Sequence, residues 1–387
     1  EAHINGVYIG DANAQAQLDR TNQCILIDGI ITDSTQHQVA QVNGKVIPAN
    51  KQWLLDIDCD SVDIAFIDFW TKDIMANPKG RAYGQIRVEG VEHLVNVTGK
   101  ALAKNAQITL PQTGVTYYFS DSVYLDDNAI RFPKIDIRDN NNKTGSFEGA
   151  VNHNYFTGFK FDLKANANNM LVMDLPEEQQ ALFYGKVYAT GDVHIYGDEL
   201  DCKIDVNAKT EANTKFFLNI NSASQATSTS FIDFVQPDTI SHYLLNFKPK
   251  EAPVNEPLAS KLRLSLNAEV TPQANICIKL GAEDNIRGYG EGNLKLVYEA
   301  PSNNVQMQGT YTMHSGQFAF SLGNIVRRNF TIRDGSSIKW DNDPLAPTLN
   351  ITGHYHTTAS LRDLFGSESS QIATDRTSVP VNCVLHM

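Results

Sequence analysis

The chain has 387 residues, of which 42% are hydrophobic and 20% charged, and its formal net charge is −12. This composition excludes a disordered chain. The negative charge argues against nucleic acid and anionic lipid headgroups as partners, because both favour a basic protein surface. No apolar run of about 18 or more residues exists, so the sequence predicts no membrane-spanning helix.

Apolar and polar residues alternate along most of the chain, which is the period of a β-strand with one buried face. Residues 53–60 place Trp53, Leu55 and Ile57 in one phase and aspartates in the other. Residues 159–164 and 262–267 repeat the pattern. Gly, Asn, Asp or Pro separates such runs about every dozen residues. The sequence therefore predicts a long antiparallel array of strands with one polar face.

Helical periodicity is scarce. Residues 176–185 predict one or two helical turns after Pro176, and residues 360–369 are a second candidate helix. Residues 247–259 contain three prolines, which remove backbone donors, so we expect a flexible loop near 247–259.

Residues 329–344 predict a hairpin with one apolar side. Phe330 and Ile332 precede a polar turn, and Ile338 and Trp340 follow it. Period two indicates a buried face and leaves open what covers that face. The candidates are a second sheet, the opposite wall of the same sheet, or something that is not protein.

Metal and disulfide signals are weak. The five cysteines are odd in number and scattered, so we expect unpaired thiols. Asp56, Asp58 and Asp60 have the spacing of a calcium loop, but Ser61 and Ile67 stand where that loop needs glycine and glutamate. The aspartates are more typical of the wet face of a strand.

Signals for catalysis are also weak. His354 and His356 share one face of a predicted strand, but no third ligand stands nearby, and two surface histidines are the simpler interpretation. Gly288, Gly290 and Gly292 do not form a dinucleotide fingerprint and indicate a turn or bulge. No nucleophile elbow or phosphate-binding loop is present. The sequence therefore predicts a protein that is not an enzyme, with no metal and no cofactor.

Residues 309–364 contain the pattern GxYxxxxGxFxFxLxN, followed by FxIxxGSxIxWxxDPxxPxLxIxAxY with small departures at Asn342 and Gly353. This stretch resembles the C-terminal domain of the TamB family. The matching residues are Gly309, Tyr311, Gly316, Phe318, Phe320, Phe330, Gly335, Ser336, Trp340, Asp343, Pro344 and Tyr355. Upstream, residues 182–198, 231–237 and 266–278 resemble the form of that family seen in Bacteroidetes-type bacteria.

The resemblance is dense from about residue 150 onward and weaker before it. It implies a β-groove segment over residues 1–150 and a TamB C-terminal-type β-groove domain over residues 151–387, in one continuous elongated structure. TamB proteins belong to the AsmA-like group. The implied fold is all-β, a long curled antiparallel sheet that forms a taco-like apolar groove, with very little helix.

The same resemblance implies a periplasmic protein, anchored in the inner membrane by an N-terminal helix that is missing from this chain. The expected function is a non-catalytic bridge that carries phospholipid between the inner and outer membranes, and so serves outer-membrane biogenesis. The expected partners are phospholipid acyl chains and an outer-membrane assembly barrel of the TamA kind. The predicted groove-lining residues are Leu262, Leu264, Leu266, Leu294, Leu296, Tyr298, Phe318, Phe320, Leu322, Phe330, Ile332, Ile338, Trp340, Leu349 and Ile351.

Two other functions fit the alternation of the strands. The first alternative is a scaffold or chaperone that assists the assembly of outer-membrane barrel proteins through its edge strands. The second is a secreted, adhesin-like β protein with a dry, filled core. A continuous apolar interior would favour the lipid conduit over both.

Overall fold

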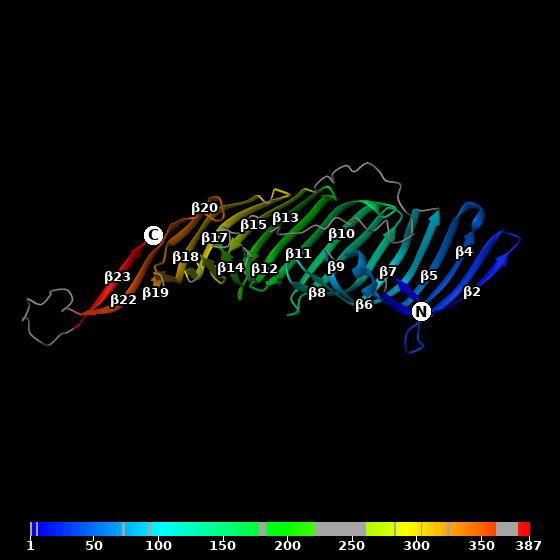
Figure 1. The fold of residues 1–387 in the computed structure, drawn as a ribbon, viewed down its shortest axis with the longest axis horizontal. Helices are drawn as coiled ribbons and strands as arrows, with labels where there is room; N and C mark the ends of the chain where they lie inside the picture. Colours follow the sequence, from blue (N-terminus) through cyan, green and yellow to red (C-terminus); the bar gives the residue numbers. More distant parts are fainter. Residues whose placement is uncertain are drawn as a thin grey trace, which may run out of the picture.

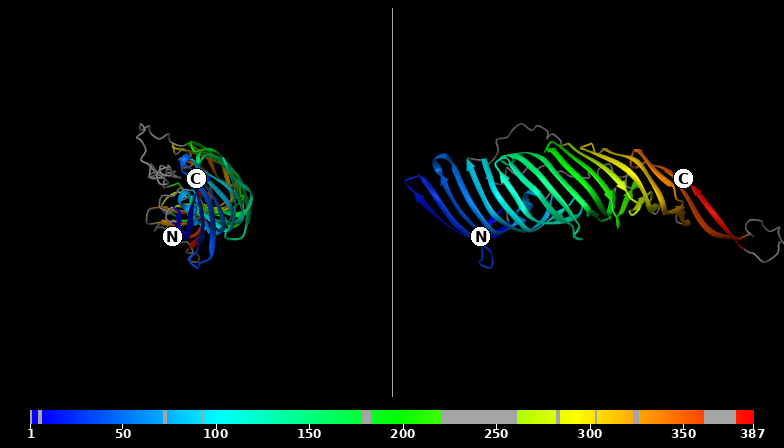
Figure 2. Two further views of the ribbon diagram at one scale, coloured as in Figure 1. Left: turned by 90° about the vertical axis from the view of Figure 1, so that its right-hand side faces the viewer. Right: turned by 180° about the vertical axis from the view of Figure 1, so that it is seen from behind.

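The computed structural model describes residues 2–4, 7–71, 74–91, 94–177, 183–220, 261–281, 284–302, 304–322, 326–360 and 378–387. These residues form one hydrogen-bonded sheet of 23 strands, drawn out into an elongated molecule (Figure 1). Seen down the long axis, the strands trace a curved cross-section (Figure 2, left). The predicted all-β fold with a long curled sheet is confirmed.

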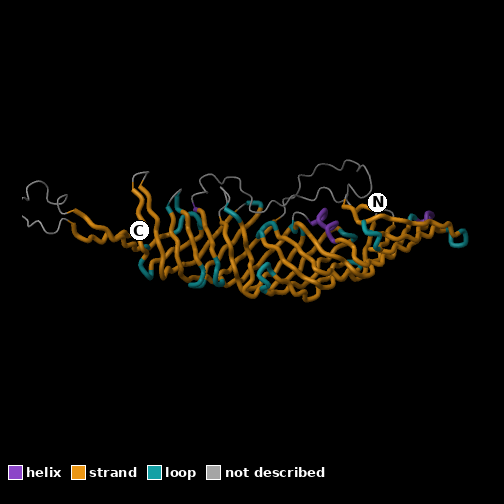
Figure 3. Tube along the Cα trace, turned by 90° about the horizontal axis from the view of Figure 1, so that it is seen from below, coloured by secondary structure: helices purple, strands orange, loops and turns teal. Residues whose placement is uncertain are grey.

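The first twelve strands follow one another as an antiparallel meander, in which each strand pairs with the next. They are β1 (Ala2–Ile4), β2 (Val7–Asp19), β3 (Cys24–Thr32), β4 (Gln38–Ile47), β5 (Gln52–Asp63), β6 (Ala76–Val91), β7 (Leu94–Leu110), β8 (Val115–Asp126), β9 (Ala129–Arg138), β10 (Thr144–Asn154), β11 (Thr157–Leu175) and β12 (Phe183–Asp198). Helix in the described residues is limited to the short turns η1 (Pro48–Asn50), η2 (Ile64–Ile67) and α1 (Asp68–Thr71) (Figure 3).

Beyond β12 the sheet continues as two walls that share long, bent strands. The strands are β13 (Asp201–Thr210), β14 (Lys215–Asn219), β15 (Lys261–Val270), β16 (Asn275–Lys279), β17 (Asn285–Ala300), β18 (Asn304–Leu322), β19 (Val326–Ile332), β20 (Ser336–Asn342), β21 (Thr348–Asn350), β22 (Thr352–Ser360) and β23 (Ser378–His386). The first wall contains β13, β15, β20 and β21, and the second contains β14, β16, β19 and β22. Strands β12, β17 and β18 each pair with the first wall over one half of their length and with the second wall over the other half.

Two pairs in this region are parallel. β13 pairs with β15, and β14 pairs with β16. Asp201 lies opposite Lys261 and Lys215 lies opposite Asn275, so both pairs have the same offset of sixty residues (261 − 201 and 275 − 215). The two segments therefore share one strand–corner–strand arrangement, and one stacks on the other.

The predicted hairpin at residues 329–344 is wrong. β19 and β20 both pair with β18, over different halves of its length, so they lie end to end on the two walls. The link between them contains Gly335, whose φ is +84° and whose N–H donates to the carbonyl oxygen of Met313 (3.0 Å). Glycine allows this left-handed conformation. The link therefore turns the chain from one wall to the other.

β-Bulges make the bend in the long strands. The registers of β7–β8 and β11–β12 shift beside Asn105 and Asn169, which have φ values of +50° and +49°. Asparagine tolerates this conformation better than most residues. The bulge leaves a backbone N–H without a ladder partner, and a hydroxyl on the next strand accepts it: Ser120 Oγ from Asn105 N and Thr190 Oγ1 from Asn169 N, both at 2.9 Å. A bulge of this kind bends its strand.

The glycine-rich stretch in β17 lies at another bulge, as predicted. The β17–β18 register shifts between Tyr289 and Gly290. A Cβ on Gly290 would overlap the carbonyl oxygen of Thr312 on β18. Asn342, which stands where the family motif often has glycine, has φ +95° and so takes the conformation that glycine would favour.

The helix predicted at 176–185 is wrong where the structure describes it. Pro176 and Glu177 are not helical, and β12 begins at Phe183. The Phe183–Leu218 pairing joins this segment to the sheet, so strand pairing overrides its weak helical pattern. Residues 178–182, the predicted loop at 247–259 and the part of the second candidate helix after Ser360 lie outside the described residues.

A buried carboxylate fixes the bend at the centre of the sheet. Asp139, which is 1% exposed, follows β9. Its Oδ1 accepts from the backbone N–H groups of Asn141 (2.8 Å) and Lys143 (2.9 Å), and its Oδ2 accepts from Leu171 N at the β11 bulge (2.7 Å). Burial raises the pKa of the neighbouring Tyr117 to about 12, and its hydroxyl donates to the Leu171 carbonyl oxygen (3.3 Å).

Asp139→Asn should destabilise the protein by about 2–4 kcal/mol, because an amide offers one acceptor and turns a donor towards a buried N–H. The free energy of unfolding, measured by denaturant titration, checks this. Asp136→Asn on the exposed face of β9 is the matched control and should change stability by less than about 0.5 kcal/mol. Equal effects of the two substitutions would contradict the role assigned to Asp139.

Candidate functional site

Strand register places apolar residues of successive strands on one face of the sheet, called here the inner face. Residues directly opposite one another in neighbouring strands point to the same side. One row of opposed positions runs from β2 to β17 and contains no polar residue other than one cysteine thiol. Its members, the apolar row, are Ala14, Gly29, Val42, Ile57, Ile86, Gly99, Leu125, Ile130, Val151, Phe161, Gly197, Cys202, Leu262 and Ala300.

The inner face is only partly covered over much of its length. From Val42 to Phe161, every side chain of the apolar row larger than glycine is half-buried. Burial raises the pKa of the Cys202 thiol, which therefore stays neutral within the row. A soluble monomer rarely leaves so extended an apolar surface in partial contact with water. The inner face is therefore the candidate functional site.

The opposite, outer face is polar. The interpretation of Asp56, Asp58 and Asp60 as the wet face of a strand is confirmed, because Asp58 and Asp60 are exposed and Asp56 accepts from Arg87 Nε (2.7 Å). His354 lies on the same face, where its Nδ1 is 3.3 Å from Asn382 Nδ2. Within the described residues, no group of three His, Cys, Asp or Glu side chains could hold a metal ion. All five cysteines are free thiols.

Near its C-terminal end the inner face becomes a packed core that joins the two walls. The core cluster consists of Leu218, Val270, Ala274, Ile278, Ile286, Met307, Tyr311, Met313, Phe318, Ile332, Ile338, Trp340 and Ile351. Ile338 and Met313 are 0% exposed, and Trp340 Nε1 donates to the carbonyl oxygen of Pro344 (3.2 Å). The apolar side of residues 329–344 therefore meets protein side chains of both walls.

The structure separates the predicted lining residues into groups. Leu264, Leu266 and Leu296 are half-buried and lie outside the core cluster. Five of the predicted lining residues belong to the core cluster, namely Phe318, Ile332, Ile338, Trp340 and Ile351. Four others are partly buried and pack against the cluster, namely Leu294, Phe320, Phe330 and Leu349. Leu262 of β15 and Tyr298 of β17 are buried. Leu262 lies opposite Ala300, and Tyr298 lies opposite Leu264. Leu322 pairs with Val326, and only its backbone is described.

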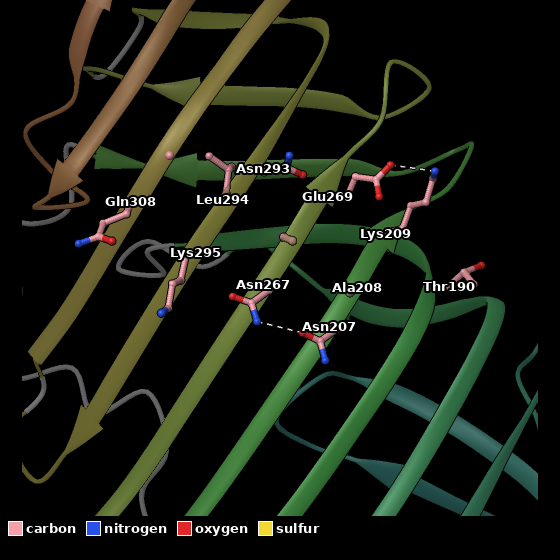
Figure 4. Close-up of a pocket in the computed structure, with 12 residues that line it drawn as sticks. Thr190, Asn207, Ala208, Lys209, Asn267, Glu269, Asn293, Leu294, Lys295 and Gln308 are labelled. Carbon is pink, nitrogen blue, oxygen red and sulfur yellow. Dashed lines mark hydrogen bonds and ion pairs between the residues drawn. The ribbon is translucent and has the colours of Figure 1, made fainter.

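The outer face carries a shallow depression of about 530 Å³ over β13, β15, β17 and β18 (Figure 4). Asn267 Nδ2 donates to Asn207 Oδ1 (2.9 Å), and Lys209 pairs with Glu269 (2.8 Å) along its floor. Amide and charged side chains border this hollow, and Ala208, Ala268 and Leu294 add apolar surface to its lining. The apolar row and the depression lie on opposite sides of the same strands.

A family model described as the TamB C-terminal domain matches residues 133–387, which is 255 of the 387 residues. The chain belongs to the TamB family. No curated protein and no solved structure matches it. TamB proteins are linked to outer-membrane biogenesis, form a non-enzymatic component of the periplasmic bridge and are associated with TamA-type partners. In the described part of this TamB chain, no helix is long and apolar enough to cross a bilayer.

The TamB match begins within β9 and covers the core cluster, whereas the apolar row extends upstream to β2. Lining residues were predicted only from Leu262 onward, and the half-buried positions in β4 to β11 were missed. Their signal was present in the sequence, because Ile57 and Phe161 lie in runs with clear alternation. Register, which aligns those runs into one row, depends on pairing between strands.

Ile338→Ala should cost about 2–5 kcal/mol of unfolding free energy, because it opens a cavity in a packed core. Leu264→Ala should cost only about 1 kcal/mol, because the half-buried leucine loses less apolar contact. Denaturant titration of both variants of this TamB chain measures the difference. Equal losses would show that the core cluster and the open part of the inner face are packed alike.

Proposed function

We propose that this TamB chain carries phospholipid along its inner face, with the acyl chains against the apolar row and the headgroups at the open side. The observation that carries the proposal is the continuity of the row across fourteen strands. A filled sandwich core would bury the whole row, whereas its members larger than glycine from Val42 to Phe161 are half-buried. A conduit needs an apolar path without a polar break.

Transfer energetics support the proposal. An acyl chain of roughly sixteen carbons costs about 13 kcal/mol to expose to water, at about 0.8 kcal/mol per methylene. A half-buried apolar surface removes much of that cost at each position along the path. Leu264, Leu266 and Leu296 extend this surface beside the row and are the lining residues that we retain for lipid contact.

In this proposal the segments 1–150 and 151–387 act as one groove between the inner and outer membranes. The full-length protein is periplasmic and held in the inner membrane by an anchor helix, and a TamA-like barrel is its partner at the outer membrane. The core cluster closes the groove at its C-terminal end. Lipid then leaves the groove before β18, through the open side.

The second candidate function is a scaffold that helps outer-membrane barrel proteins to assemble. Two strand edges favour it. Within the described residues, β23 pairs only with β22, and residues 12–19 of β2 form ladder pairs only with β3. A free edge can accept a strand from another protein by β-augmentation. This function needs the edges and does not need a continuous apolar row.

A matched pair of substitutions on β15 separates the two functions. Leu264→Arg places a cation on the half-buried inner face, and Ser265→Arg places the same charge on the outer face. Leu264→Arg should stop lipid transfer in cells while the protein stays folded and abundant, because a charge repels acyl chains. Ser265→Arg should be nearly silent.

Photo-crosslinkers at positions 264 and 265 measure lipid contact directly. The conduit predicts strong lipid labelling at 264 and little at 265. Equal labelling at both positions would contradict it. A folded Leu264→Arg protein that keeps full function would favour the scaffold instead.

A further inference from the structure

One polar side chain interrupts the inner face near its rim. His153 lies at the end of β10 on the same face as Val151, which belongs to the apolar row, and it is 6% exposed. Among the described residues, its Nε2 is the only buried side-chain nitrogen or oxygen that has no hydrogen-bond partner. Buried polar groups are normally paired, so an orphan of this kind requires an explanation.

The neighbouring hydrogen bond fixes the position of the imidazole proton. Phe156 N donates to His153 Nδ1 (3.3 Å), so Nδ1 is an acceptor. Burial lowers the pKa of His153, so the ring is neutral. A neutral ring with an accepting Nδ1 carries its proton on Nε2. His153 therefore holds a buried N–H donor with nothing to accept it.

The turn beside His153 is strained. Tyr155 and Phe156 join β10 to β11 and have φ values of +50° and +58°. Such two-residue turns favour Asn-Gly, and bulky residues rarely adopt this conformation. The turn nonetheless holds the Phe156 ring flat against the imidazole, with centroids 4.4 Å apart and planes at 17°. Strain that persists beside an unpaired donor points to a functional site.

The surroundings identify the acceptor that would fit. The Glu199 carboxylate accepts from Phe159 N (2.6 Å), and Phe159 contacts the imidazole ring edge-on at 6.1 Å. On the other side, His153 N donates to the carbonyl oxygen of Asn128 (2.9 Å), next to Asp127. A neutral imidazole offers an N–H donor without a positive charge, so it has no electrostatic preference for an anionic ligand atom. A neutral acceptor, such as a carbonyl oxygen, is the best match.

We propose that His153 Nε2–H donates a hydrogen bond to an ester carbonyl oxygen of a glycerolipid whose acyl chains lie along the apolar row. The inference rests on the proposed lipid-carrying function and adds a defined polar contact to it. Val151 and Phe161 place the row directly beside His153, so a lipid with its tails there has its ester linkages at the rim. Phe156 stacks on the face of the imidazole and leaves the edge that carries Nε2–H to the lipid.

The test compares two lipids that differ only at the proposed contact. Diacyl and dialkyl phosphatidylethanolamine of equal chain length share the headgroup, but the dialkyl form has ether links and no carbonyl oxygen. The purified chain is incubated with vesicles of both lipids, and native mass spectrometry measures the lipid retained. The wild-type protein should retain the diacyl form about five-fold more, the effect of one neutral hydrogen bond.

His153→Phe removes the donor and keeps a ring against Phe156, so it should abolish the preference and leave dialkyl binding unchanged. His153→Gln restores a donor near the Nε2 position and should recover part of the preference. Thermal unfolding checks that both variants fold. The comparison of the two lipids is made on the wild-type protein, so it does not depend on whether either variant folds.

The outcomes distinguish this inference from the function on which it rests. Binding of both lipids without preference overturns the His153 contact and leaves the conduit intact. A His153→Phe protein that retains the preference also overturns it. If His153→Phe weakens both lipids equally, the contact is to phosphate and the carbonyl assignment fails. If the wild-type protein retains neither lipid, the proposed function fails and the contact fails with it.

Discussion

The structure depends on how a sheet can bend sharply without leaving backbone amides unpaired. A bulge removes an N–H from the ladder, and a buried N–H without a partner is costly. Here hydroxyls of neighbouring strands accept from Asn105 and Asn169, and the Asp139 carboxylate accepts from Leu171. The two hydroxyls lie on the adjacent strands, and Asp139 lies in the turn after β9, so the acceptors link each bend to other parts of the sheet. The curved cross-section, and so the sheltered inner face, depends on this series of contacts.

Side chains on the inner face are packed differently in its C-terminal part and in the part upstream. Near the C-terminal end the walls meet in the core cluster, whose buried side chains supply much of the hydrophobic stabilisation in the described residues. Upstream, from Val42 to Phe161, the members of the apolar row larger than glycine stay half-buried. In the proposed conduit, a surface that accepts and releases acyl chains cannot also be filled by its own side chains. Separating the two regions along the sheet meets both requirements.

Much of the fold could be predicted from the sequence because strand alternation is local. The phases of Leu264 and Phe320 follow from their immediate neighbours, and register confirms that each shares a face with its predicted partners. The link at Gly335, which turns the chain from one wall to the other, could not be distinguished from a hairpin. In the sequence, both consist of two alternating runs around a polar turn. The difference is set by β18, which pairs with both flanking strands and is distant in sequence.

The candidate site was predicted less completely than the fold. Alternation shows that a face is buried and does not show whether protein or another molecule covers it. Trp340 and Leu264 have the same pattern, yet only Trp340 lies in the core cluster. His153 carried no signal, because a single histidine in a strand has no distinctive spacing. Its character arises from the strained turn and the missing partner, which only the three-dimensional arrangement reveals.

The parallel pairs β13–β15 and β14–β16 have an evolutionary consequence. Both pairs have the same sixty-residue offset, so one strand–corner–strand unit stacks on the other with paired residues at that offset. A duplication of this unit would insert another layer and leave the pairing of the flanking strands unchanged. The molecule could thus grow longer by gene duplication alone.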